Sequence, residues 1–277
     1  MNLLLSLCLG GTMYFIRKAI FSLIDICIIL SIPLVAQVNY SEKLAINPDV
    51  TIGELDNGLR FYIKENKKPE NRALIWLAVS AGSVLEEDNQ QGLAHLAEHM
   101  AFNGTKNFKK HEIIDYLESI GMQFGPEINA YTSFDQTVYM LQVPSDSAEM
   151  VEKGFDILED WAFNISFEDE EVDKERGVVI EEWRLGRGFR MRMIDKELPI
   201  IFKDSKYASR LPIGKKEILE TFEYETLKNF YFDWYRPDLM AVIAVGDFEK
   251  EEIQKLIAKH FGVIPARQNP KEKMKSH

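Results

Sequence analysis

The sequence predicts an α+β domain in which a mixed, largely antiparallel sheet packs against helices. Three observations support this fold class. Apolar or alternating stretches of strand length end at tight turns, longer stretches carry the spacing of amphipathic helices, and no repeat or low-complexity linker divides the chain. A chain of 277 residues can hold one large domain or two small ones. We expect residues 37–277 to form a single domain.

The first expected elements are strands. An Asn-Gly pair at 57–58 separates two β-type stretches, residues 51–55 and 59–64, and this pair is a strong signal for a hairpin turn. The nearly continuous apolar run over 73–81 is long enough for a buried strand. An acidic loop, 82–91, then leads into a short helix.

The rest of the chain mixes helices with further strands. Pro, Gly and capping residues bound each stretch. The expected elements are, in order, helix 111–119, strands 123–131 and 136–143, helix 147–163, one long charged helix 167–196, helix 223–235, strand 239–245 and helix 249–260.

The first 36 residues have the pattern of an export signal. A basic pair at 17–18 precedes an apolar run over 19–36 that ends in a small residue. Asp25 and Pro33 interrupt this run, which favours a cleaved signal peptide over a membrane anchor formed by residues 19–36. We therefore expect an exported protein, periplasmic or secreted.

Composition narrows the possible partners and ligands. The formal net charge is −11, with 44 acidic against 33 basic residues, which disfavours nucleic acid as a partner. Both cysteines, Cys8 and Cys27, lie in the predicted export signal. The mature chain would then have no thiolate ligand, so any zinc would be bound by histidine and carboxylate.

The most informative motif is His95-Leu96-Ala97-Glu98-His99. Residues four apart lie on one face of a helix, so His95 and His99 can bind one ion with Glu98 beside it. This is the inverted zinc-protease motif, H-x-x-E-H, in which the glutamate is the catalytic base. The alternative is an ordinary amphipathic helix lined by two histidines.

A third metal ligand is expected from the long charged helix. Glu175 and Glu182 are seven residues apart and share a helix face, whereas Glu181 is rotated away. Two carboxylates on a partly apolar face need a cation or hydrogen-bond donors. The alternative is that all three belong to a charged surface helix.

The sequence resembles the pitrilysin/insulinase zinc peptidases, or inverzincins, and most of all their periplasmic or secreted bacterial members. The resemblance rests on motifs that occur in the family's order: residues 92–105, Asn129-Ala130-Tyr131-Thr132, residues 175–183 and residues 235–238. It implies the fold of the mitochondrial-processing-peptidase-like metallohydrolase domain.

The resemblance also implies roles for the site residues. His95 and His99 would bind one zinc ion, and Glu98 would be the base. The local pattern before Trp183 makes Glu182 the third ligand and Glu175 its supporter. The family's usual spacing favours Glu175 instead, because it lies 76 residues after His99 and Glu182 lies 83 after it.

Substrate contacts follow from the same resemblance. Asn129 and Ala130 would lie on an edge strand that binds an extended peptide by strand addition. Phe102 would line a side-chain pocket near the metal, although simple core packing is an equal alternative.

The resemblance implies a zinc-dependent endopeptidase that hydrolyses oligopeptides or unfolded polypeptides with a zinc-activated water. Family members pair homologous domains around a chamber, and a second domain or chain is expected as a partner. The alternative is a catalytically weak binding or assembly subunit that needs this partner. Metal-dependent ribosyl-homocysteine lyases share the motif, but this chain resembles them less. Their site uses a cysteine, and the mature chain would have none.

Overall fold

The computed structural model describes residues 45–273. Within these residues, six strands form one sheet in the order β1-β2-β6-β3-β5-β4. All neighbouring pairs are antiparallel except β2 with β6, which is parallel. The predicted fold, a mixed and largely antiparallel sheet with helices, is therefore confirmed. The strands are β1 (Thr51–Glu54), β2 (Arg60–Glu65), β3 (Arg72–Val79), β4 (Ile128–Thr132), β5 (Thr137–Pro144) and β6 (Met240–Gly246).

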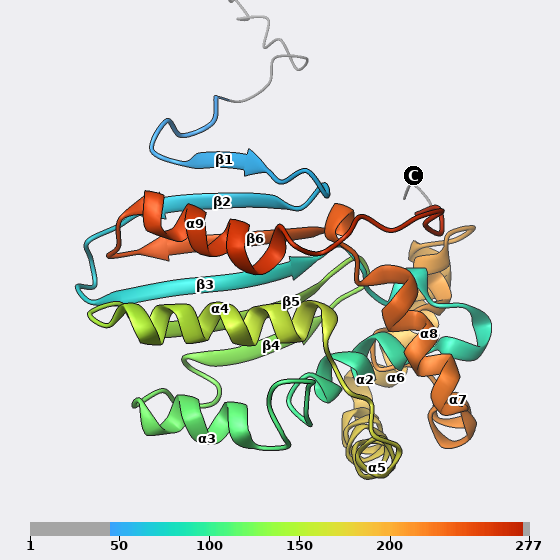
Figure 1. Cartoon of the computed structure of the whole chain (residues 1–277). Helices are drawn as coiled ribbons and strands as arrows, with labels where there is room; N and C mark the ends of the chain where they lie inside the picture. Colours follow the sequence, from blue (N-terminus) through green and yellow to red (C-terminus); the bar gives the residue numbers. More distant parts are fainter. Residues whose placement is uncertain (1–44, 274–277) are drawn as a thin grey trace, which may run out of the picture. The chain divides into compact units, whose positions relative to one another are not determined.

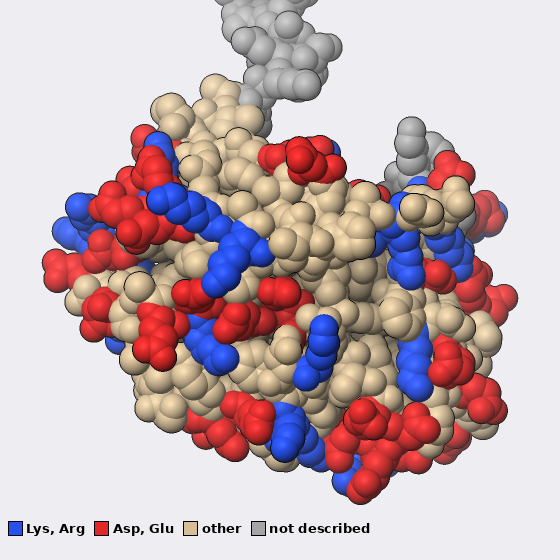
Figure 2. Space-filling model, viewed as in Figure 1, with Lys and Arg blue, Asp and Glu red and all other residues tan. Residues whose placement is uncertain are grey.

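The predicted export signal lies outside the described residues. No helix within residues 45–273 is both long enough and apolar enough to cross a membrane. Figure 2 shows Lys and Arg interspersed with Asp and Glu over the visible face of the molecule.

The β1–β2 hairpin turns at the predicted Asn-Gly pair. Gly58 has a φ of +90°, a conformation that glycine adopts without steric cost. The side-chain amide of Asn57 donates to the carbonyls of Phe261, at 2.7 Å, and Ile264, at 2.8 Å. These bonds join the turn to the end of the helix that spans residues 250–261. Asn57 is therefore both a turn residue and a buried contact.

One face of the sheet is covered by two helices, α4 (Ala148–Phe163) and α9 (Lys250–Phe261), which lie across it in Figure 1. The alternate residues of β3 that point to this face, from Ala73 to Val79, are buried. The opposite face presents a row of half-buried apolar side chains in cross-strand register, which are Tyr62, Ile243, Trp76 and Met140.

Six further α-helices lie within residues 45–273, and the one formed by residues 93–100 contacts β4. They are α2 (Leu93–Met100), α3 (Glu112–Ser119), α5 (Asp169–Gly186), α6 (Phe189–Ile201), α7 (Lys216–Thr221) and α8 (Tyr224–Trp234). Short 3₁₀ turns at Ser83–Leu85, Asp88–Gln90, Lys206–Ser209 and Pro237–Leu239 connect several of these elements.

Two expected elements differ from the structure. The single helix predicted over 167–196 is two helices, because Gly188 is extended (φ −65°, ψ −178°) and breaks the helix between α5 and α6. The strand predicted from residue 123 begins only at Ile128. Gly125, with a φ of +101°, is in the turn that delays it.

Candidate metal centre

Helix α2 carries the H-x-x-E-H motif and is buried on most of its surface. Six of its eight residues are buried, including Leu96, Met100 and Glu98. Gly92 precedes it with a φ of +102°, and a β-carbon there would lie 3.2 Å from the Gly214 Cα. The positive φ favours glycine and the close approach leaves little room for a side chain, so Gly92 suits the start of this helix.

A buried carboxyl group holds the start of α2. Oε1 of Glu86 accepts from the backbone N–H of Gly92, at 3.0 Å, and of Ala94, at 2.9 Å. Burial raises the pKa of Glu86 to about 8. The Arg210 guanidinium donates to the Glu86 backbone carbonyl at 3.1 Å. The sequence analysis did not identify Glu86. An acidic residue shortly before a helix can accept from its first backbone N–H groups, and this position is the signal that could have identified it.

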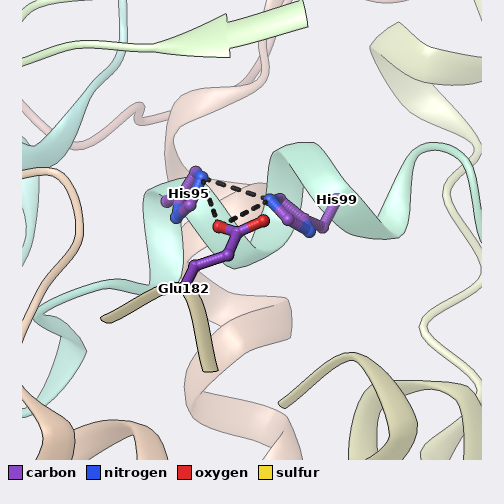
Figure 3. Close-up of side chains that lie close together, drawn as sticks. All are labelled: His95, His99 and Glu182. Carbon is purple, nitrogen blue, oxygen red and sulfur yellow. Dashed lines mark hydrogen bonds and ion pairs between the residues drawn. The ribbon is translucent and has the colours of Figure 1, made fainter. Parts of the chain in front are cut away.

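His95, His99 and Glu182 point their ligand atoms at one another (Figure 3). The two Nε2 atoms are 3.1 Å apart. Oε2 of Glu182 lies 3.8 Å from the His95 nitrogen and 3.7 Å from the His99 nitrogen. Ligand atoms around a tetrahedral zinc lie about 3.4 Å apart, so this two-histidine, one-carboxylate set fits the ion.

Glu175 points to the other side of His99. Its Oε1 lies 2.7 Å from Nδ1 of His99, and its Oε2 accepts from the Asn103 side chain at 2.8 Å. Both carboxylate oxygens are therefore engaged away from the ligand cluster. A carboxylate on the far nitrogen of a histidine orients the ring and makes it a better metal ligand. The sequence analysis gave Asn103 no role, whereas its side chain donates to Glu175.

The protonation of the two histidines differs with their surroundings. Burial lowers the pKa of His95 to about 4, which leaves the imidazole neutral, as a metal ligand must be. Burial also lowers the pKa of His99, but the Glu175 hydrogen bond and the nearby carboxylates outweigh it and raise that pKa. The same bond helps to lower the pKa of Glu175 against the opposing effect of burial.

Glu98 lies beside the ligands without joining them. It is 7% exposed, and burial raises the pKa of its carboxyl group. The Thr132 hydroxyl donates to its Oε2 at 2.8 Å. A raised pKa makes a carboxylate a stronger base.

A cavity of about 560 Å³ opens over the site. Its lining brings together the residues to which the sequence analysis gave a role in the site, which are His95, Glu98, His99, Phe102, Asn129, Ala130, Glu175 and Glu182. Phe124 also lines it, with its ring centroid 5.6 Å from that of Phe102. The Phe102 ring also packs against Trp161, with the ring centroids 5.1 Å apart, so this side chain contacts both the cavity and the core.

Asn129 and Ala130 lie on β4, the edge strand of the sheet nearest α2. The backbone N–H of Ala130 bonds to the side-chain oxygen of Asn129 at 2.9 Å instead of to β5. This amide belongs to the unpaired edge of the strand, and an added strand could accept from it.

An inverted H-x-x-E-H helix with a glutamate from a later helix, beside an open sheet edge, is typical of one class of zinc peptidases. The profile of the insulinase family (peptidase family M16) matches residues 62–185, which include every site residue named above. The profile of the peptidase M16 inactive domain matches residues 221–276. The chain belongs to the insulinase family of peptidases.

Relatives in this family are named as zinc proteases. "Probable zinc protease PqqL" of Haemophilus influenzae is 40% identical over 230 residues, which cover 83% of this chain and 24% of that protein. "Zinc protease PQQL-like" of Arabidopsis thaliana is 45% identical over 210 residues, or 76% of this chain and 22% of that protein. The chain thus spans about a quarter of the length of the curated relatives it matches.

A solved structure shares the fold. The first half of the periplasmic protease PqqL from Escherichia coli aligns with a TM-score of 0.79 and 36% sequence identity. The alignment covers 84% of this chain and 50% of that one.

Proposed function

We propose that this chain carries the catalytic site of a zinc-dependent endopeptidase that hydrolyses oligopeptides or unfolded polypeptides. One zinc ion would be held by His95, His99 and Glu182, with Glu175 orienting His99. The observation that carries the proposal is the convergence of three ligand atoms beside the buried Glu98. A zinc ion bound there supplies a Lewis acid that polarises a carbonyl and lowers the pKa of water.

The remaining chemistry belongs to Glu98. Its carboxylate takes a proton from the attacking water, whose oxygen bonds to the peptide carbon. The C–N bond then breaks, and Glu98 returns the proton to the leaving amine. The products are a carboxylic acid and an amine, so all atoms of water and peptide are accounted for.

The edge strand β4 supports an extended peptide as the substrate. Strand addition would place main-chain groups of the substrate opposite Asn129 and Ala130 and along the cavity. The apolar Phe102 and Phe124 rings would then contact a substrate side chain. Activity on folded proteins is not expected, because the bound segment must be extended.

A second homologous domain or chain is the proposed partner. The row of half-buried apolar side chains on the open sheet face supports contact with further protein. The relatives' greater length supports the same proposal. The alternative function is a binding or assembly subunit that cleaves poorly until this partner is present.

Export to the periplasm or secretion is proposed from the pattern of residues 1–36. The periplasmic PqqL of Escherichia coli is a relative with the same fold, which supports this location.

The Glu98→Gln variant tests the proposed activity. It removes the proton acceptor but keeps the side-chain shape, so we expect zinc content to stay at the wild-type level and peptide cleavage to be lost. Cleavage of an unstructured peptide mixture would be followed by mass spectrometry, with and without candidate partner chains. Glu149→Gln, an exposed glutamate on α4, is the control and should cleave as wild type. Full activity of the Glu98→Gln protein would refute the mechanism.

A further inference from the structure

The hydroxyl of Thr132, the last residue of β4, reaches across to helix α2. Its Oγ1 lies 2.8 Å from Oε2 of Glu98. A carboxylate oxygen only accepts hydrogen bonds, so the hydroxyl of Thr132 is the donor. The contact joins the substrate-side edge of the sheet to the proposed base, and the sequence analysis assigned Thr132 no role.

The neighbouring hydroxyl of Thr137 does not donate to Thr132. Oγ1 of Thr137 is 3.4 Å from that of Thr132, and it donates its own proton to the Ala81 carbonyl at 3.0 Å. Thr137 is fully buried and has no second proton to give. The Thr132 proton therefore goes to the nearer acceptor, the carboxylate of Glu98.

This contact fixes one of the two oxygens of Glu98. Among residues 45–273, Thr132 is the residue whose side chain hydrogen-bonds the Glu98 carboxylate. With Oε2 engaged by the hydroxyl, Oε1 is the oxygen left to exchange a proton with water.

We propose that Thr132 is a positioning residue, which holds the Glu98 carboxylate so that Oε1 faces the attacking water. The inference rests on the proposed peptidase function. A glutamate side chain has several rotatable bonds, and a base displaced by about 1 Å can cost about 100-fold in rate. Thr132 would then affect the chemical step and leave substrate and metal binding intact.

Three variants test this role. Thr132→Val keeps the branched shape and removes the hydroxyl, Thr132→Ser keeps the hydroxyl, and Ser133→Ala is the control. The Ser133 hydroxyl donates to the Gln136 carbonyl, at 3.3 Å, and not to Glu98. For Thr132→Val we expect kcat to fall about 10- to 100-fold, with KM and zinc content unchanged. Thr132→Ser should regain most of the rate, and Ser133→Ala should match wild type.

An unchanged kcat in Thr132→Val would overturn the proposal, as would a Thr132→Ser protein as slow as the valine variant. If the zinc-loaded wild type cleaves no peptide, the proposed function fails, and crystal structures decide the positioning role separately. A Glu98 carboxylate that turns away from its wild-type position in Thr132→Val would support the role, and one that stays in place would overturn it.

Discussion

Helices α2 and α6 differ completely in burial. Six of the eight residues of α2 are buried, whereas none of the thirteen residues of α6 is. Helix α5, which supplies Glu175 and Glu182, is intermediate and buries only Val172 and Val179. The candidate metal centre is therefore assembled from a largely buried helix, which carries the histidines and Glu98, and a mostly unburied helix, which carries the two glutamates.

The two site glutamates of α5, Glu175 and Glu182, also differ in how they are held. Glu175 has both oxygens hydrogen-bonded, and the adjacent Arg176 donates to the Leu219 carbonyl at 2.8 Å. Two turns later, the Glu182 side chain is 44% exposed. We therefore expect Glu182 to shift more than the histidines when a metal binds.

The largest effect on zinc affinity is expected when the proposed ligand Glu182 is removed. Glu182→Ala removes one of three proposed ligand atoms, so zinc affinity should fall by more than the roughly 100-fold that loss of a supporting residue causes. Competition with a chelator of known affinity measures it. The matched control is Glu181→Ala, because that exposed neighbour pairs with Arg184 at 2.8 Å. Equal zinc affinity in the two variants would exclude Glu182 as a ligand.

A smaller effect is expected at the anchored glutamate. Glu175→Gln keeps the shape but weakens the hydrogen bond that orients His99, and such changes cost about 10- to 100-fold in metal affinity. The same chelator competition checks this value. A loss greater than that of Glu182→Ala would reverse the two assignments, in agreement with the family's usual spacing.

The contrast in burial between α2 and α6 predicts a clear difference in stability. Its expected effect on function is smaller than that of the two glutamate substitutions. Leu96 on α2 is 0% exposed and Ile200 on α6 is 76% exposed. Leu96→Ala should lower the free energy of unfolding by about 2–5 kcal/mol. Ile200→Ala should change it by less than about 0.5 kcal/mol. Urea unfolding of the two variants measures both, and similar losses would mean that α6 is covered by protein in solution.

Local patterns were sufficient to predict the elements with strong boundary signals. The Asn-Gly hairpin, the motif helix and the apolar central strand all depend on neighbouring residues, and the structure has them within a few positions. The break between α5 and α6 was missed because Gly188 is followed by residues that can continue a helix. Glycine at that position costs a helix only about 1 kcal/mol, so sequence alone did not decide.

Long-range contacts explain the rest of what was missed. The role of Glu86 depends on a turn that brings it back to the start of α2, and that of Thr132 depends on β4 lying beside this helix. Neither contact leaves a periodic signal in the sequence. The proposed ligands could be named from the sequence because His95 and His99 lie four residues apart on one helix and Glu182 shares a helix face with Glu175.

The position of the bound metal tests the central claim most directly. Crystals of the zinc-loaded chain, measured at the zinc absorption edge, should give one anomalous peak within bonding distance of His95 Nε2, His99 Nε2 and a Glu182 oxygen, with Glu175 still on His99 Nδ1. A peak bonded to Glu175, or no peak between the two histidines, would contradict the account.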